Sequence, residues 1–208
     1  MHISILLENS LIARVTEFVV LKHGEQKRKG GVAYYTHPIA VSSYLIDRGY
    51  GIEHALTALL HDIKEDTDTT DAEILAICGA YGKIVLHSID LLTKDKDNYN
   101  EDEYYGAIIK DYIARPVKLY DRVNNIVSLD TADEEFRERY IEETITTFPK
   151  LCKRVTDTYD LGVALSKFGK VLKLDTLPTV VQSTKIFVDD TPPLKTLSHL
   201  LPEVVIEP

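Results

Sequence analysis

Apolar residues recur with the period of an α-helix along most of this chain. From Leu11 to Val19 they fall at i, i+3, i+4 and i+7, directly after Ser10, which is a suitable residue to cap a helix. Glycine and basic residues between Gly24 and Gly31 interrupt this pattern. The same period predicts further helices over residues 37–49, 52–64, 71–79, 84–94, 101–114, 116–130, 133–148 and 149–174. The sequence therefore predicts an all-α fold.

The character of the sequence changes after Thr176. Five of the eight prolines lie beyond this point, so helix is not expected there. Val180–Val181 and Lys185–Val188 favour at most a short strand or hairpin. We expect two units in the 208 residues: a helical domain over residues 1–175, and a Pro-rich C-terminal tail over residues 176–208 whose role the sequence leaves open.

Composition and charge narrow the classes of partner. The formal net charge is −9, which argues against nucleic acid as a partner because that binding needs clustered Lys and Arg. A small phosphorylated molecule remains compatible with this charge, since a local basic patch or a metal ion can offset it. We expect no membrane partner and no signal peptide, and Cys78 and Cys152 are typical of buried thiols in a cytoplasmic protein. The oligomeric state stays open.

Ionisable side chains crowd one end of the helix predicted over residues 52–64. His61 and Glu65 form one i, i+4 pair, and Asp62 and Asp66 form a second beside it. Crowded like charges destabilise a helix end unless water or a cation lies among them. An adjacent His–Asp pair can offer one imidazole and one carboxylate to the same metal ion, but two ligands leave such an ion undercoordinated.

Two further candidates can complete that ligand set. His37 precedes Pro38 at a predicted helix start, and Asp121 belongs to a polar stripe on an otherwise apolar helix. The stripe consists of Lys118, Asp121, Arg122, Asn125 and Ser128. Each feature also has a simpler interpretation, because the stripe can be an exposed face, and Glu65 and Asp66 a solvated helix terminus. The joint order of these features is what favours a metal site.

The remaining five histidines are interpreted as structural or surface residues. His54 lies two helical turns from His61, about 10 Å away, which is too far to share one ion. The other four have no organised acidic neighbours; they are His2, His23, His87 and His199.

With these residues placed, the sequence resembles the HD-type hydrolase domain of the RelA/SpoT family, especially its small stand-alone alarmone hydrolases. The resemblance covers roughly residues 10–130. It rests on five segments in the family's order: residues 24–38, ending in Tyr-Thr-His-Pro; residues 58–67, Ala-Leu-Leu-His-Asp-Ile-Lys-Glu-Asp-Thr; residues 81–82, Tyr-Gly; residues 92–94, Leu-Thr-Lys; and residues 117–125, Val-Lys-Leu-Tyr-Asp-Arg-Val-Asn-Asn.

The resemblance implies an HD-domain-like helical bundle and a role for each matched residue. The implied metal ligands are His37, His61, Asp62 and Asp121, with manganese as the typical ion. Glu65 and Asp66 would be catalytic, because they would orient or deprotonate the attacking water. Arg28, Lys29, Asn125 and Ser128 would bind the substrate, with Arg28 near the guanine. The implied reaction is hydrolysis of the 3′-pyrophosphate of (p)ppGpp, and the implied partner is a small nucleotide.

Several residues depart from the family's pattern without removing a ligand. We expect them to alter the pocket wall, and hence the identity of the substrate; they are Ala33, Lys64, Tyr120, Asn124 and Val127. Two alternatives therefore stand beside the leading hypothesis. One is a phosphohydrolase acting on another nucleotide such as NADPH, and the other is a catalytically silent nucleotide-binding domain.

Overall fold

The computed structural model describes residues 2–172, and residues 2–6 by their backbone alone. Within this range the chain is helical and without strands, apart from an isolated bridge between Lys27 and Ala33, so the predicted all-α class is confirmed. The longer helices are α1 (His2–His23), α2 (Thr36–Asp47), α3 (Ile52–Leu60), α5 (Asp71–Cys78), α6 (Gly82–Leu92), α7 (Glu101–Lys110), α8 (Ala114–Val127), α9 (Glu134–Thr147) and α10 (Val155–Ser166). Shorter elements are α4 (Ile63–Asp66) and 3-10 turns at Gly79–Tyr81, Leu129–Thr131 and Phe148–Leu151.

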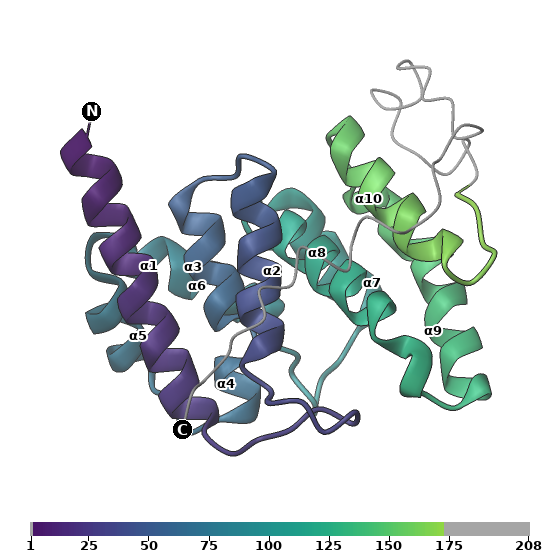
Figure 1. Cartoon of the computed structure of the whole chain (residues 1–208), viewed down its shortest axis with the longest axis horizontal. Coiled ribbons are helices and arrows are strands. Elements are labelled where there is room, and N and C mark those ends of the chain that lie inside the picture. The colour runs from purple at the N-terminus through teal and green to yellow at the C-terminus, as the bar shows by residue number, and fades with distance from the viewer. Residues whose placement is uncertain (1, 173–208) are drawn as a thin grey trace, which may run out of the picture.

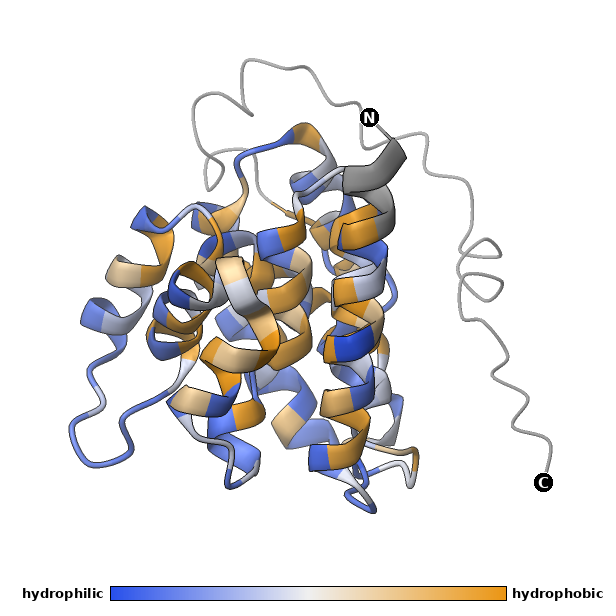
Figure 2. Ribbon diagram, turned by 90° about the vertical axis from the view of Figure 1, so that its left-hand side faces the viewer, coloured by the Kyte–Doolittle hydropathy of each residue, from blue (hydrophilic) through white to orange (hydrophobic). Residues whose placement is uncertain are grey.

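Helix α3 lies at the centre of the bundle and packs against α1, α2, α6 and α8 (Figure 1). Seven of its nine residues are buried, because these four helices surround it. One apolar core fills the space among α1, α3, α5 and α6, and a second surrounds α8. The apolar segments gather on the inner helices, and most loops are hydrophilic (Figure 2).

The run Asp71–Leu92 is long and apolar enough to cross a membrane by length and composition. In the structure the 3-10 turn at Gly79–Tyr81 divides this run, and its two halves, α5 and α6, pack against each other. Their approach is close at Gly82, where an added Cβ would lie 2.9 Å from the Leu75 carbonyl oxygen. The run is thus a pair of packed helices rather than one straight helix.

Several predicted helix boundaries are confirmed and others are wrong. Thr70 caps α5, and its side chain and that of Glu73 form a reciprocal capping box. Ser10 caps nothing, because α1 already begins at His2. The predicted helix 101–114 ends at Lys110, since the Asp111 side chain accepts the amides of Ile113 and Ala114 and so starts α8. Over the described part of the helix predicted for 149–174, the chain forms a 3-10 turn and then α10, which ends at Ser166.

The helix predicted over residues 52–64 is also interrupted, at His61 and Asp62. His61 Nδ1 lies 2.7 Å from the Ala58 carbonyl oxygen, the acceptor that the Asp62 amide would use in a continuous helix. A side chain that takes a backbone acceptor competes with the helix, as polar residues near helix ends commonly do. The expected tail over residues 176–208 and its expected hairpin lie outside the described residues.

Candidate metal centre

Three separate elements bring two imidazoles and two carboxylates together. His37 lies in the first turn of α2, His61 and Asp62 at the break between α3 and α4, and Asp121 in the middle of α8. His37 Nε2 is 3.1 Å from Asp121 Oδ1 and 3.8 Å from Asp62 Oδ2. His61 Nε2 is 3.1 Å from Asp62 Oδ2 and 3.6 Å from Asp121 Oδ1. The four residues matched to the family's ligands therefore converge on one point.

The hydrogen bond of His61 to Ala58 decides which ring nitrogen faces this point. A carbonyl oxygen only accepts, so Nδ1 donates to it, and Nε2 carries the lone pair of the neutral ring. Nε2 is buried, and it finds no hydrogen-bond partner among the residues that the structure describes. A lone pair directed at two carboxylate oxygens is repelled unless a cation lies between them. The donor set thus fits a divalent metal ion, and ligand atoms of His37, His61 and Asp121 all lie within 4.8 Å of one another.

The electrostatics of the ion-free centre point the same way. Burial lowers the pKa of His61, but the carboxylates of Asp62 and Asp121 outweigh it and raise that pKa to about 10. Burial raises the pKa of Asp62 and Asp121, and the neighbouring cationic groups still hold both below the usual range. Lys118 Nζ contributes, 3.1 Å from Asp121 Oδ2. The centre therefore attracts positive charge strongly, as a proton here or as a metal ion.

Glu65 and Asp66 lie on the short helix α4, beside the centre but more exposed than the ligands. The Lys94 amide donates to Glu65 Oε1 over 2.8 Å, which fixes the direction of that carboxylate. The Asp66 carbonyl oxygen accepts from the Gln26 side chain over 2.7 Å, so it ties α4 to the loop after α1. Because the helix breaks at His61, Glu65 and Asp66 lie on α4 and not on a continuation of α3.

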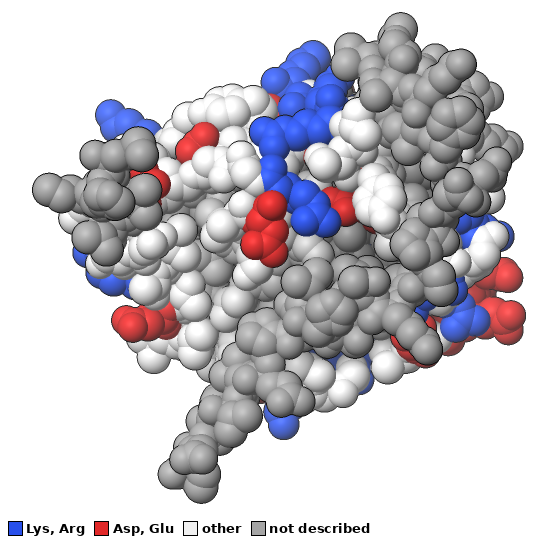
Figure 3. All heavy atoms as spheres, turned by 45° about the horizontal axis from the view of Figure 1, so that its top comes forward, with Lys and Arg blue, Asp and Glu red and all other residues white. Residues whose placement is uncertain are grey.

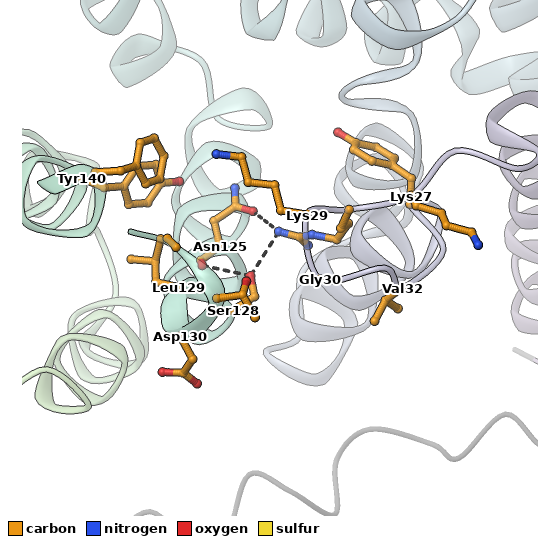
Figure 4. Close-up of a pocket in the computed structure, with 14 residues that line it drawn as sticks. Lys27, Lys29, Gly30, Val32, Asn125, Ser128, Leu129, Asp130 and Tyr140 are labelled. Atoms are coloured by element: carbon orange, nitrogen blue, oxygen red, sulfur yellow. Dashed lines mark hydrogen bonds between the residues drawn. The ribbon is translucent and has the colours of Figure 1, made fainter. Parts of the chain in front are cut away.

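A pocket of about 630 Å³ opens on the side of α8 that faces the basic loop (Figure 4). All four predicted substrate-binding residues line it: Arg28, Lys29, Asn125 and Ser128. The loop is closed by the bridge between Lys27 and Ala33, and Gly31, with φ +83°, makes its turn. Lys29 Nζ lies 4.9 Å from the centre of the Phe136 ring, and Tyr140 stacks on Phe136. The pocket thus combines basic and aromatic walls.

Hydrogen bonds join this pocket to the metal centre. Arg28 donates to Asn124 Oδ1 over 3.2 Å, to Asn125 Oδ1 over 2.6 Å and to Ser128 Oγ over 3.1 Å. Asn125 Nδ2 donates in turn to Asp121 Oδ1 over 2.6 Å, and Asn124 Oδ1 lies 2.7 Å from His37 Nδ1. Arg28 and the two asparagines are therefore shared by both parts of the site.

Tyr34 is a site residue that the sequence patterns did not single out. Its hydroxyl donates to Asp62 Oδ2 over 2.6 Å, while the same residue lines the pocket. Its ring packs on His23, with 4.8 Å between ring centres. His23 was interpreted as structural, and it supports the site in this way. The only available signal was the position of Tyr34 three residues before His37.

Several residues that the sequence analysis discussed lie away from the site. Arg122, part of the predicted polar stripe, lies between the rings of Tyr140 and Phe148 and donates to Glu143, so it belongs to the core. His54 is held by the Tyr112 carbonyl oxygen at 3.0 Å. Of the departures from the family, Tyr120 is fully buried against Asp160 of α10, and Lys64 pairs with surface aspartates.

Asn124 alone among these departures contacts both Arg28 and His37. On the face that Figure 3 shows, Lys and Arg side chains gather near the top centre, beside a few Asp and Glu side chains.

Comparison with known proteins matches this picture. A guanosine-3′,5′-bis(diphosphate) 3′-pyrophosphohydrolase of Aquifex aeolicus (strain VF5) is 36% identical over 148 residues, which are 69% of this chain and 21% of that protein. A GTP pyrophosphokinase rsh of Brucella ovis is 33% identical over 156 residues, which are 72% of this chain and 21% of that protein. The chain thus spans about a fifth of the length of these relatives. No family model matches the sequence.

The fold has a counterpart among solved structures. A structure reported for a metazoan orthologue of SpoT that hydrolyses ppGpp superposes with a TM-score of 0.64 at 22% identity, over 76% of this chain and 96% of that one. The resemblance predicted from the motifs, and the helical bundle that it implies, are confirmed.

Proposed function

From the likeness of this chain to the RelA/SpoT hydrolase domain, we propose that it is a metal-dependent phosphohydrolase that converts (p)ppGpp and water to GDP or GTP and pyrophosphate. The observation that carries the proposal is the double contact of Asn125. It donates to Asp121 at the metal centre and accepts from Arg28 in the pocket. A nucleoside in this pocket would place its phosphates beside the centre.

His37, His61, Asp62 and Asp121 would hold the ion. Their mixed imidazole and carboxylate donors suit manganese, and they also accept zinc, iron or nickel. When bound, such an ion supplies Lewis acidity, since it polarises a phosphoryl oxygen and lowers the pKa of water. Tyr34 would keep Asp62 Oδ2 directed at the ion, and Asn125 would do the same for Asp121 Oδ1.

Glu65 and Asp66 would orient the attacking water or accept its proton. The water oxygen forms a bond to the phosphorus that carries the ribose 3′ oxygen. The bond between this phosphorus and the 3′ oxygen breaks, so pyrophosphate leaves, and the 3′ oxygen takes up a proton. Glu65 is held by the Lys94 amide through Oε1, and a carboxylate held this way can accept a proton, a role that contributes typically ~10²–10⁴-fold in rate.

The aromatic and basic walls of the pocket suit a purine nucleotide. Phe136 and Tyr140 offer flat rings on which a base can stack. Three of the five N–H donors of Arg28 are already used in hydrogen bonds to Asn124, Asn125 and Ser128, and the flat face of its guanidinium is available for stacking on the base. Lys29 supplies a cation for a phosphate oxygen.

A second candidate is the same chemistry on another nucleotide, such as NADPH. It is favoured by Asn124, which departs from the family at a position in direct contact with Arg28. A third, a silent nucleotide-binding domain, is disfavoured by the convergence of all four ligand residues. The membrane-free, cytoplasmic setting stays an expectation from the sequence.

Incubation of the metal-stripped chain with ppGpp, with and without manganese, tests the proposal. The expected result is GDP and pyrophosphate only when manganese is present. Phosphate release from NADPH without reaction of ppGpp would support the second candidate. Binding of ppGpp with manganese but without turnover of any nucleotide would support the third.

A further inference from the structure

We infer that Asn124 is a positioning residue of the metal centre and that Arg28, through Asn124 and Asn125, couples nucleoside binding to metal binding. This inference rests on the proposed function, because it takes the four ligand residues to hold an ion and the pocket to hold a nucleoside. It adds a route by which each ligand alters the affinity of the site for the other.

Arg28 fixes the orientation of both side-chain amides. Its guanidinium faces Asn124 at 3.2 Å and Asn125 at 2.6 Å. A guanidinium has donors and no acceptor, so the atom that each asparagine turns toward it must be the amide oxygen. Without Arg28, either amide could turn over and present nitrogen instead.

The orientation of Asn124 sets the form of the His37 ring. His37 Nδ1 lies 2.7 Å from the same Oδ1 that accepts from Arg28. Because that oxygen accepts, Nδ1 must be the protonated nitrogen, and Nε2 of the neutral ring carries the lone pair. Nε2 faces Asp121 Oδ1 at 3.1 Å, on the side where the ion would lie. A partner of this kind orients a ligating histidine and raises its basicity.

The orientation of Asn125 acts on the second ligand. With its oxygen directed at Arg28, its nitrogen faces Asp121 Oδ1 at 2.6 Å. That oxygen is also the one nearest to both ligand imidazoles, at 3.1 Å from His37 and 3.6 Å from His61. Two hydrogen-bonded chains thus leave one guanidinium and meet again at the centre.

A nucleoside that stacks on Arg28 would hold the guanidinium in this position. A fixed Arg28 fixes the orientation of both asparagines, and through them that of His37 and Asp121, before the ion binds. The ion then restricts less side-chain motion on binding, so it binds more tightly. Coupling between two binding equilibria is reciprocal, so the ion must strengthen nucleoside binding by the same factor. Of the two asparagines, Asn124 links Arg28 directly to a proposed histidine ligand, His37, while Asn125 links it to Asp121.

The test is calorimetric titration of manganese into the full metal-stripped chain, with and without saturating guanosine. Guanosine has no phosphate, so it cannot contact the ion through one. The wild-type chain is expected to bind manganese at least ~5-fold more tightly with guanosine present. Asn124→Ala is expected to weaken manganese binding by ~10- to 100-fold. In this variant the ratio of the manganese affinities with and without guanosine should fall close to one.

Two further variants separate positioning from general damage. Asn124→Asp keeps an oxygen for both Arg28 and His37, so it should restore most of the affinity lost in Asn124→Ala. Asn98→Ala makes the same change at an exposed asparagine whose side chain donates to Asp95, so it should keep both the manganese affinity and the guanosine effect. Circular dichroism verifies that each variant is folded.

The outcomes distinguish this inference from the proposed function. If the wild-type chain binds no manganese, the metal site itself fails and both are overturned. If it binds manganese and guanosine, yet Asn124→Ala behaves like the wild type, the inference is overturned and the proposed hydrolase stands.

Discussion

The ring of His61 and the carbonyl oxygen of Ala58 lie 2.7 Å apart, and this one contact both ends helix α3 and directs the other ring nitrogen at two carboxylates. The break that it causes lets Asp62 turn toward the same centre. His61 and Asp62 can therefore serve one ion although they are adjacent in sequence, where a regular helix would direct neighbouring side chains about 100° apart.

Asp62→Ala is expected to abolish hydrolysis because the centre loses a ligand. Metal content after dialysis against manganese should fall with the activity, and both should be measured on the same sample. Asp68→Ala is a matched control, since Asp68 is an exposed acid paired with Lys22 on the surface. Full activity with normal metal content in Asp62→Ala would exclude Asp62 as a ligand.

Glu65→Gln is expected to keep the metal and to slow turnover by at least ~10²-fold. Glutamine retains an oxygen for the Lys94 amide, so the side chain keeps its place while losing the ability to take a proton. The measurement is kcat beside metal content. A rate near that of the wild type would remove Glu65 from the role of general base.

Tyr34→Phe is expected to weaken manganese binding by ~10- to 100-fold. The lost hydrogen bond goes to a charged oxygen, and such bonds contribute ~1.5–3 kcal/mol. The ring remains to pack on His23, so the variant should stay folded, which circular dichroism can verify. Tyr35→Phe, the same change one residue later, is the control, and equal manganese affinity in both variants would contradict the prediction.

The metal-free chain is expected to lose stability as the pH rises from 7 to 10. Burial opposes protonation of His61, but Asp62 outweighs it, so the folded pKa is about 10 against 6.5 for an unperturbed histidine. A raised pKa stabilises the fold fully below about pH 6.5, and this contribution disappears as the pH passes 10. Urea unfolding across this range should show the loss.

Saturating manganese should remove most of that pH dependence, because a metal takes the deprotonated nitrogen. His61→Gln should lack the dependence even without metal. Stability of the metal-free wild type that is constant, or that rises with pH, would show that His61 is not held protonated between the carboxylates.

Much of the fold could be predicted from the sequence because helical periodicity and capping are local. Thr70 and Glu73 are three residues apart, and the capping box that they form is visible in the sequence. The four proposed ligands could be named from the sequence because their order and spacing match a known family. The break at His61 could not, since it depends on a side chain that outcompetes an amide for the Ala58 carbonyl oxygen.

The contacts among the residues around the proposed ligands could not be predicted either, although Arg28 and Asn125 were themselves expected in the site. Arg28 and Asn125 are 97 residues apart, and Tyr34 and Asp62 are 28 apart, so only the packing of α2, α3 and α8 brings them into contact. Arg122 shows the reverse error. Its place on a polar stripe suggested the site, while its stacking between two aromatic rings could be seen only in three dimensions.

The ligands come from α2, from the junction of α3 and α4, and from α8, so a bound ion would act as a crosslink between segments far apart in the chain. A crosslink of this kind restricts separation of the helices, and its removal by a chelator releases them. Amide hydrogens in α2 and α8 should then exchange with solvent faster after chelation, while those of α5, which supplies no ligand, should hardly change. The same ion that supplies the chemistry would thus set how often the bundle opens.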